Sequence, residues 1–523
     1  MLDYLIINGN VLDGSGAAAE ALNVGIQGDR IAYIGTGSHP ARHIIDAANM
    51  VVSPGFIDSH AHSEFTLFAD GRAQGKLAQG VTTEINGNCG LSAAPLSGEA
   101  KERREADQKE YGITERWSTF GEYFEKLNAR GLGLNLVTLC GHGNIRASVI
   151  GYREGEPSAA ELADMKSLLL DALDSGAKGL STGLIYPPGV YSSAEEIIEL
   201  TAAAAKKHPS VIYATHMRSE GDGLIESIEE ALRIGRESSA AVHISHIKTS
   251  GEENWDKIDK AISLIDDAHA SGMRVTCDRY PYVASSTDLD VVIPAWVYAG
   301  GVQEELRRLR DASTREKIVS GLKSREDKYW QNIYISSVTR PENRWMEGEN
   351  IFDIAAKLGS HPADAVVDIT IKEEARASAI FFSMCEQNLR RFLALPFVMI
   401  GSDSSVKSFS GVTCSGKPHP RGFGSFPRFL GRYVRDEGIV GLPEAIRKMT
   451  SLPASVFGLR ERGLIKMGYY ADLVVFDYGT ISDRAAFKDP FQQPQGIGNV
   501  FINGGPAFSD GHFSEKLNGR IIT

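Results

Sequence analysis

Two histidines one residue apart follow a short apolar run near the start of the chain, where residues 55–62 read GFIDSHAH. In an extended strand, residues i and i+2 point to the same side, so both imidazoles face one way where the strand ends. Neutral imidazole is a common ligand of zinc-type ions. Because two histidines at this spacing are seldom both solvated or core residues, we interpret His60 and His62 as part of a metal site.

Four more side chains suited to metal or proton chemistry stand at or just after the ends of other apolar runs: Cys89, His216, His246 and Asp403. Each alone has a plain structural alternative, since a cysteine can be a small buried hydrophobe, a histidine a core residue and an aspartate a helix N-cap. Jointly, imidazole, thiolate and carboxylate groups suit a zinc-type ion that keeps an open position for water. His243 is out of register with His246, so we expect it to face a helix and to be structural.

The elements that must position these side chains alternate between short apolar runs and helical stretches, the βα pattern of a parallel sheet or barrel. Eight runs are predicted as strands: 56–59, 81–85, 134–139, 179–183, 211–215, 241–245, 274–277 and 398–401. Amphipathic helices are predicted between most of them, for example at 158–175, 193–208, 223–237 and 254–271. Eight strands favour a (β/α)8 TIM-type barrel over an open doubly wound sheet, and such a barrel carries its active site at the carboxyl ends of its strands.

Both ends of the chain depart from this pattern, because they carry short strands broken by turns. We predict that residues 1–54 and 455–523 combine into one small β-sandwich domain beside a barrel formed by residues 55–454. The gap between the seventh and eighth strands is too long for one helix and contains a charged inserted subdomain, about 287–345, with a helix predicted at 303–323. Such an insertion on this face of a barrel usually builds a lid or a binding wall.

Composition narrows the classes of function. The chain has 523 residues, of which 42% are hydrophobic and 23% charged, as in ordinary globular proteins. Its formal net charge of −12 argues against a nucleic-acid or anionic-membrane partner, which would require a basic face. No apolar run approaches the roughly 20 residues of a membrane span. Five scattered cysteines without a CxxC pair predict reduced thiols or a metal ligand and not a disulfide framework. An N-terminus without a basic region gives no sign of a signal peptide, so a cytoplasmic protein is expected.

Taken together, the histidines and the aspartate at the strand ends resemble the amidohydrolases, and the segment 462–477 is similar to the C-terminal segment of that superfamily. Five short motifs resemble one family within it, the D-aminoacylases or N-acyl-D-amino-acid deacylases: NGNCG at 86–90, THMR at 215–218, SHIK at 245–248, YPY at 280–282 and PHPR at 418–421. The resemblance covers nearly the whole chain. It implies an enzyme that uses zinc to hydrolyse the amide bond of small-molecule N-acyl-D-amino acids.

The same resemblance assigns roles at the metal. It implies one tightly held zinc on three ligands and a second, weaker metal position bordered by three more side chains: Cys89, His216 and His246, and then His60, His62 and Asp403. It also implies that Asp403 takes the proton of the attacking water and returns it to the leaving amine. Many relatives bridge two metals with a carboxylated lysine on strand four. Lys178 lies early in that strand, so we expect it to be structural, with Cys89 serving instead.

Substrate binding is implied by further positions of the same motifs. In the resembled family, the arginine that matches Arg421 binds the α-carboxylate of the substrate, helped by residues that match Tyr280 and Ser286. A guanidinium fork fits a carboxylate with two bonds. Without the resemblance, a surface arginine paired with an acid is a fair alternative. Lys248 adds a cation near the active face, and His142, at the end of strand three, either lines the pocket or is structural.

Two other functions remain open from the sequence. One is a different amidohydrolase, acting on cyclic amides and imides or on dipeptides. The other belongs to a different class, a metal-free and non-catalytic scaffold with the amidohydrolase fold. The retained set of metal ligands argues against the scaffold, because such a protein has no need of it.

Overall fold

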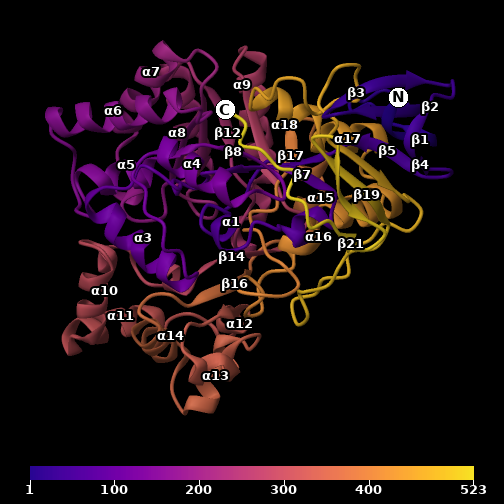
Figure 1. Cartoon of the computed structure of the whole chain (residues 1–523). Coiled ribbons are helices and arrows are strands. Elements are labelled where there is room, and N and C mark those ends of the chain that lie inside the picture. Colours follow the sequence, from indigo (N-terminus) through magenta and orange to yellow (C-terminus); the bar gives the residue numbers. More distant parts are fainter.

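A barrel of eight parallel strands occupies the centre of the protein, for which a computed structural model describes residues 1–523 (Figure 1). The strands are β6 (Phe56–Asp58), β7 (Val81–Asn86), β8 (Asn135–Thr138) with its continuation β9 (Cys140–Gly141), β10 (Gly179–Gly183), β11 (Ile212–His216), β12 (Ala241–Ile244), β13 (Val275–Arg279) and β17 (Val398–Ile400). Hydrogen bonds join β6, β7 and β8, and join β9 through β13 to β17. Ala61 pairs with Ser404 in parallel, so the first strand lies beside the last. The predicted (β/α)8 barrel is confirmed, with small shifts at the strand ends.

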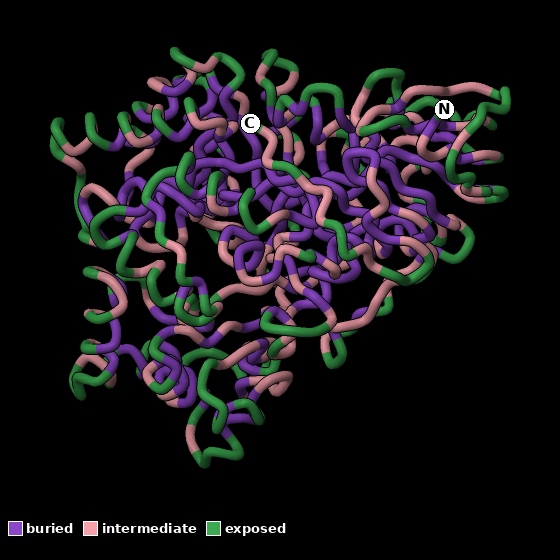
Figure 2. Tube along the Cα trace, in the orientation of Figure 1, coloured by how far each residue is buried: buried purple, intermediate pink, exposed green.

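Helices connect the strands and cover the outside of the barrel. They are α1 (Thr66–Ala69), α2 (Gln74–Leu77), α3 (Gly98–Glu110), α4 (Phe120–Arg130), α5 (His142–Val149), α6 (Ala159–Asp174), α7 (Ala194–Lys207), α8 (Leu224–Ser238), α9 (Ile258–Ala270), α15 (Glu386–Ala394), α16 (Arg421–Arg428), α17 (Leu442–Met449) and α18 (Ser451–Val456). Capping boxes built on Ser158 and Thr119 start α6 and α4. A core of 75 buried residues lies largely between the strands and these helices, where the chain in Figure 2 is mostly purple.

Both chain ends contribute to one small β domain. Its strands are β1 (Leu2–Val11), β2 (Glu20–Gln27), β3 (Arg30–Gly35), β4 (Ala41–Asp46), β5 (Val51–Pro54), β18 (Leu473–Phe476), β19 (Ile497–Ile502), β20 (Gly505–Ser509) and β21 (His512–Phe513). Hydrogen bonds join all nine into one sheet, in which β18 pairs antiparallel with β5 and so links the two ends. Val24, Val52, Leu473 and Phe501 belong to its separate core of 12 residues. The domain boundaries at residues 54 and 454 remain predictions.

A subdomain with its own core is inserted between β13 and β17. It contains β14 (Ala284–Asp288), β15 (Ile333–Ser337) and β16 (Ser378–Phe382), together with α10 (Val302–Arg310), α11 (Ala312–Leu322), α12 (Asp327–Gln331), α13 (Ile351–Leu358) and α14 (Pro362–Lys372). Its core has 20 buried residues, among them the fully buried Trp330. These elements continue past residue 345 to 382, and Figure 1 shows α10 to α14 grouped below the barrel. The subdomain therefore provides a wall that a barrel alone lacks.

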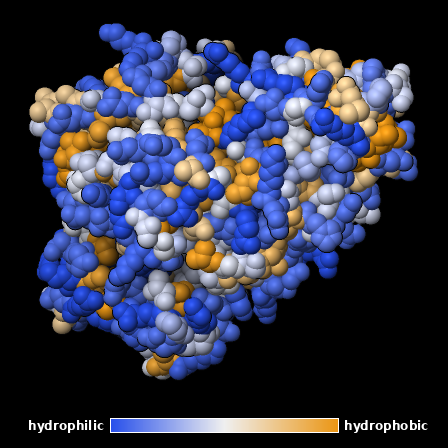
Figure 3. All heavy atoms as spheres, in the orientation of Figure 1, coloured by the Kyte–Doolittle hydropathy of each residue, from blue (hydrophilic) through white to orange (hydrophobic).

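The visible face of the molecule is largely hydrophilic, with small scattered apolar patches (Figure 3). None of the helices combines the length and the apolar character needed to cross a membrane.

Candidate active site

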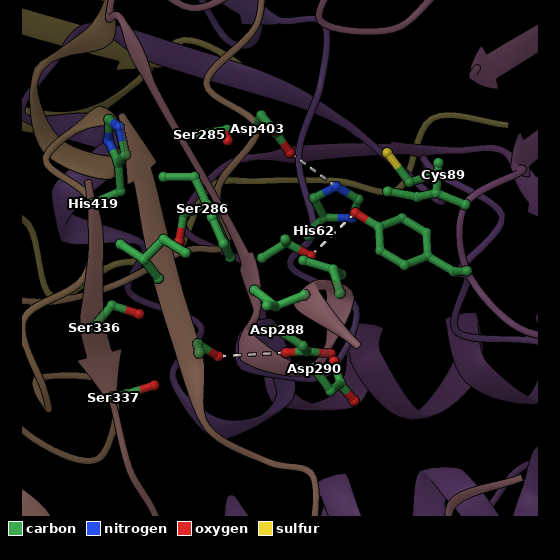
Figure 4. A pocket seen from close by; sticks show the side chains of 18 of the residues that line it. His62, Cys89, Ser285, Ser286, Asp288, Asp290, Ser336, Ser337, Asp403 and His419 are labelled. Carbon is green, nitrogen blue, oxygen red and sulfur yellow. Dashed lines mark hydrogen bonds and ion pairs between the residues drawn. The ribbon is translucent and has the colours of Figure 1, made fainter. Parts of the chain in front are cut away.

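The side chains at the carboxyl ends of the barrel strands converge on one point. Cys89 Sγ lies 3.4 Å from both His60 Nε2 and His246 Nε2. The two nitrogens His60 Nε2 and His62 Nε2 are 3.2 Å apart. Asp403 Oδ1 lies 3.2 Å from His62 Nε2 and 3.5 Å from His60 Nε2. Figure 4 shows His62, Cys89 and Asp403 in the same pocket, with the His62–Asp403 contact dashed.

His216 joins this cluster beside a carboxylate that the sequence reasoning missed. Its ring lies 4.4 Å from that of His246, and His216 Nε2 is 3.8 Å from Glu220 Oε2. Glu220 Oε1 also lies 2.8 Å from His246 Nδ1. Both ring nitrogens of His216 are buried without a hydrogen-bond partner. Buried polar atoms are rarely left without a partner. The free ring nitrogens of His216 are therefore available to bind a group such as a metal ion.

Unusual backbone geometry aims these side chains. Cys89, His246 and Asp403 have φ angles of 53°, 35° and 50°, in the left-handed region that non-glycine residues seldom adopt. Such conformations cluster at functional sites, where the surrounding structure enforces them. Gly90 follows Cys89 at φ 75°, and a Cβ there would lie 2.8 Å from the backbone nitrogen of Gly183. The glycine of the NGNCG motif therefore lets the thiol loop approach β10.

Negative charge dominates the cluster. Burial lowers the pKa of His62, but Asp403 and Cys89 outweigh it and raise this pKa to about 9. Burial raises the pKa of the Cys89 thiol, yet His60 and His246 outweigh it and hold this pKa well below its usual value. The pKa values of His60 and His246 are raised in the same way, whereas burial lowers that of His216, so most of these imidazoles attract protons and the site is short of positive charge. These donors therefore fit a divalent cation, with thiolate and neutral imidazole as ligands suited to zinc.

Arg421 is buried against the proposed catalytic acid. It is 5% exposed, and its Nη1 lies 2.7 Å from Asp403 Oδ2, while its Nη2 donates to the backbone oxygen of Ser286 at 3.1 Å. Burial raises the pKa of Asp403, but Arg421 and His60 outweigh it and hold this pKa well below its usual value. Arg421 is therefore paired with an acid, as one interpretation of the sequence allowed, but the pair is buried inside the site and does not lie on the surface. The pairing keeps Asp403 ionised.

The other predicted substrate residues border the same cavity, whose volume is about 1970 Å³. The ring of Tyr280 lies 4.6 Å from the Arg421 guanidinium, and its hydroxyl is buried without a partner. Lys248 forms an ion pair with Glu220, and its Nζ lies 2.9 Å from His246 Nδ1. Every predicted site residue lines this cavity except His60, which is fully buried.

A second carboxylate that the sequence reasoning missed, Asp278 of β13, contacts three buried histidines. It is fully buried, and its Oδ2 lies 2.9 Å from His60 Nδ1 and 2.8 Å from His243 Nε2. Its Oδ1 accepts a hydrogen bond from His246 N at 3.0 Å. His243 does contact Phe457 next to α18, yet Asp278 also connects it to His60 of the candidate metal site. Carboxylates in this position fix the tautomer and orientation of ligating histidines.

Lys76, His142 and Lys178 lie outside the cavity, and the first two have defined side-chain partners. Lys76 is fully buried, pairs with Asp58 Oδ2 at 2.5 Å and donates to Ser402 Oγ at 2.7 Å, so it fixes the ends of β6 and β17. His142 Nε2 lies 2.8 Å from Glu196 Oε1, away from the cavity, which fits the structural alternative. Lys178, expected to be structural, lines a different cavity.

Comparison with known proteins agrees with this arrangement. The Amidohydrolase family matches residues 43–505. The D-aminoacylase of Alcaligenes xylosoxydans xylosoxydans is 36% identical over 521 residues, covering 99% of this chain and 97% of that protein. A crystal structure of D-aminoacylase shares 37% identity, covers 100% of both chains and gives a TM-score of 0.84. The N-acyl-D-glutamate deacylase of Bordetella bronchiseptica, solved with zinc and a phosphonate mimic of the tetrahedral intermediate, shares 34% identity at a TM-score of 0.84, covering 100% of this chain and 99% of that one. With its barrel, the cysteine, histidines and aspartate that cluster at its strand ends, and this full-length match, the chain belongs to the amidohydrolase family.

Proposed function

We propose that the protein hydrolyses the amide bond of N-acyl-D-amino acids with the help of zinc, releasing a carboxylate and a free D-amino acid. The observation that carries this proposal is the convergence on one cavity of a thiol of low pKa, imidazoles, an ionised carboxylate and a buried guanidinium. The relatives named D-aminoacylase and N-acyl-D-glutamate deacylase support it, because they match this chain from end to end.

Six side chains would hold metal, three at a tight zinc and three at a weaker second position: Cys89, His216 and His246, and then His60, His62 and Asp403. Zinc, when bound, polarises a carbonyl group and lowers the pKa of a bound water toward about 7. The unpartnered nitrogens of His216 support its place among the ligands. Asp278 and Glu220 would orient the imidazoles of His60 and His246, since each carboxylate lies within hydrogen-bonding distance of one of them.

Asp403 would move the proton. Its carboxylate is 12% exposed, faces the cavity and is kept ionised by Arg421, so it can accept a proton from the attacking water. It can then deliver that proton to the nitrogen of the leaving amine, which departs poorly as an anion. A single carboxylate thus acts first as base and then as acid.

Arg421, Tyr280 and Ser286 would hold the α-carboxylate of the substrate. The unpartnered Tyr280 hydroxyl and the Arg421 guanidinium lie next to each other on the cavity wall. Lys248 is already engaged by Glu220, so it serves the ligand network more directly than it serves the carboxylate. When the α-carboxylate and the scissile amide are both fixed, only one configuration at the α-carbon directs the side chain into the free part of the cavity.

The test is a hydrolysis assay over matched N-acetyl-D- and N-acetyl-L-amino acids with added zinc. We expect release of the D-amino acids at much higher kcat/KM than of the L forms, and loss of this activity in Cys89→Ala. Cys385→Ala is the matched control, because Cys385 lies outside the cavity at the start of α15. Activity confined to cyclic amides, or turnover unchanged in Cys89→Ala, would contradict the proposal.

We also propose that the protein acts in the cytoplasm on small molecules and not on nucleic acid. Its five cysteines are unpaired, and the net charge of −12 disfavours polyanions. Recovery of the protein in the cytosolic fraction of its own cells is expected, and recovery outside them would contradict this location.

A further inference from the structure

Three carboxyl groups form a polar wall in the same cavity as the candidate metal-binding residues. Asp288 ends β14, Asp290 follows it, and Glu305 belongs to α10 of the inserted subdomain. All three carboxylates line the cavity that contains Cys89 and Asp403, and Figure 4 shows the two aspartates in the same pocket as His62. Asp288 is exposed to the cavity, whereas Glu305 is only 1% exposed.

These carboxylates lack cationic partners. None of the three forms an ion pair, and the side chain of Asp288 accepts only one long hydrogen bond, from Ser378 Oγ at 3.4 Å. Burial raises the pKa of Glu305 to about 7, and the charge of Asp288 adds to this rise.

Arg103 of α3 lines the cavity and opposes the rise in the pKa of Glu305 without pairing with any acid. Arg104, the next residue, also acts on Asp288 but is paired with Asp107. Arg103 is therefore the unpaired cation beside three carboxyl groups. Burial and the neighbouring acids raise the pKa of Asp290 as well, so further positive charge is needed to keep all three groups ionised.

Two buried polar atoms at this wall have no partner. Glu305 Oε1 is one, and the hydroxyl oxygen of Tyr298, a residue that is 9% exposed, is the other. Burial raises the pKa of Tyr298, and the charges of Asp290 and Glu305 add to this rise, so both acids act on its hydroxyl. A carboxylate oxygen accepts hydrogen bonds, and a neutral hydroxyl also has lone pairs to offer. A cationic group that donates hydrogen bonds would satisfy both atoms and would also supply the positive charge that this wall lacks.

The strand β14 relates this wall to the reaction centre. The backbone oxygen of Ser286 accepts a hydrogen bond from Arg421, so this point of β14 lies at the proposed carboxylate subsite. Asp288 is two residues further, so its side chain points to the same side as that of Ser286, about 7 Å along the strand. An extended lysine side chain spans about 6 Å from its Cα to its nitrogen, by bond lengths alone. The spacing thus matches a basic side chain whose α-carboxylate is held by Arg421.

We propose that Asp288, Asp290 and Glu305 bind the cationic side chain of a D-lysine, D-ornithine or D-arginine residue, so that the enzyme prefers N-acyl derivatives of basic D-amino acids. This specificity rests on the proposed hydrolysis of N-acyl-D-amino acids. The ammonium or guanidinium group donates hydrogen bonds to the three carboxylates and to the hydroxyl of Tyr298. Arg103 then limits the excess of negative charge when no substrate is bound.

The test compares N-acetyl-D-lysine with N-acetyl-D-norleucine, which has the same carbon chain without the ammonium group. We expect kcat/KM to be at least about tenfold higher for the lysine derivative, as for a charge-assisted hydrogen bond, and N-acetyl-D-glutamate to fall below both. Asp288→Asn should reduce the ratio of lysine to norleucine about tenfold, and Asp288→Lys should shift the preference toward glutamate. The control is Glu316→Gln, which removes an exposed carboxylate of α11 outside the cavity and should leave both rates unchanged.

The possible outcomes separate this specificity from the underlying activity. Equal kcat/KM for the lysine and norleucine derivatives would overturn the cation site and leave the proposed hydrolysis intact. No hydrolysis of any N-acetyl-D-amino acid would overturn both. A further pair, N-(6-aminohexanoyl)-D-norleucine and N-hexanoyl-D-norleucine, places the amine on the acyl group instead. A gain there, without one for N-acetyl-D-lysine, would mean that the acidic wall binds the acyl chain and that its assignment to the side chain is wrong.

Discussion

Replacing Arg421 with alanine should harm catalysis in two separable ways. In the proposed reaction the guanidinium holds the α-carboxylate of the substrate, and in the structure it already lies 2.7 Å from Asp403 Oδ2. Both partners are largely buried, at 5% and 12% exposure of their side chains, so water cannot readily replace the lost charge. The variant therefore removes one substrate contact and one stabiliser of the ionised base.

The size of each effect follows from these contacts. A hydrogen bond to a charged group contributes about 1.5–3 kcal/mol, so kcat/KM on N-acyl-D-amino acids should fall about 10- to 100-fold through the carboxylate alone. Arg421 is also the largest influence that lowers the pKa of Asp403. In the wild type the depressed pKa keeps this base ionised down to low pH. Without Arg421 its pKa rises, so the base is protonated at higher pH and the acidic limb of the kcat/KM profile moves upward in pH.

The assay measures kcat/KM against pH for N-acyl-D-amino acids, for their L forms and for the matching amides, which lack the carboxylate. Arg421→Ala should lose much less activity on the amides than on the acids, and the ratio of D to L should narrow because one attachment point is gone. Arg432→Ala, which removes a guanidinium paired with Glu386 outside the cavity, should change none of these ratios. Equal losses on acids and amides, with the D/L ratio and the acidic limb unchanged, would refute the reasoning. Arg421 would then only support the start of α16, and Lys248 would be the next candidate for the carboxylate.

Three further outcomes are expected. Cys89→Ala should lose the tightly held zinc, and elemental analysis that finds wild-type zinc in this variant would make the ligand assignment wrong. Asp403→Asn should keep its zinc and its fold while kcat falls roughly 10²–10⁴-fold, so near-normal turnover of the zinc-loaded variant would exclude Asp403 as the acid and base. Lys76→Met should lower the free energy of unfolding by about 3–5 kcal/mol in denaturant titrations, because it leaves Asp58 buried without its cation. A change no larger than that of the exposed Lys101→Met would contradict this.

Strand-end reasoning located most of the candidate site, because a parallel barrel brings the carboxyl ends of all its strands to one face. It placed His60 and Asp403 together although they come from the first and last strands. It missed Glu220, which lies in the loop after β11, where no periodicity tells the direction of a side chain. It also missed Asp278, because the predicted strand ended at residue 277 while β13 runs to Arg279.

The inserted subdomain shows where local patterns stop being informative. The helix predicted at 303–323 is two helices, because the side chain of Asp311 accepts a hydrogen bond from Thr314 N and caps a new start, α11. The strand β14 pairs with β16 along its length, from Ala284 with Phe382 to Asp288 with Ser378. Such pairing joins segments far apart in the sequence, and it places Asp288 in the same cavity as Cys89 and Asp403. No local pattern near Asp288 could predict that position.

The left-handed backbone at Cys89, His246 and Asp403 connects the reactivity of the site to its stability. Each such residue costs roughly 1–3 kcal/mol, and glycine, which would avoid the cost, has no side chain to offer a ligand or a base. His246 N donates to Asp278 Oδ1 and Asp403 N donates to the backbone oxygen of His60, which helps to hold this backbone in place. The fold nevertheless leaves the Cys89 thiol and the Asp403 carboxylate around the same imidazoles. A bound divalent ion removes the repulsion between these two anionic groups and binds only the folded arrangement, so its binding free energy adds to the stability of the fold. The backbone strain at Cys89, His246 and Asp403 is thus offset, because the folded chain can bind a cation where these three side chains meet.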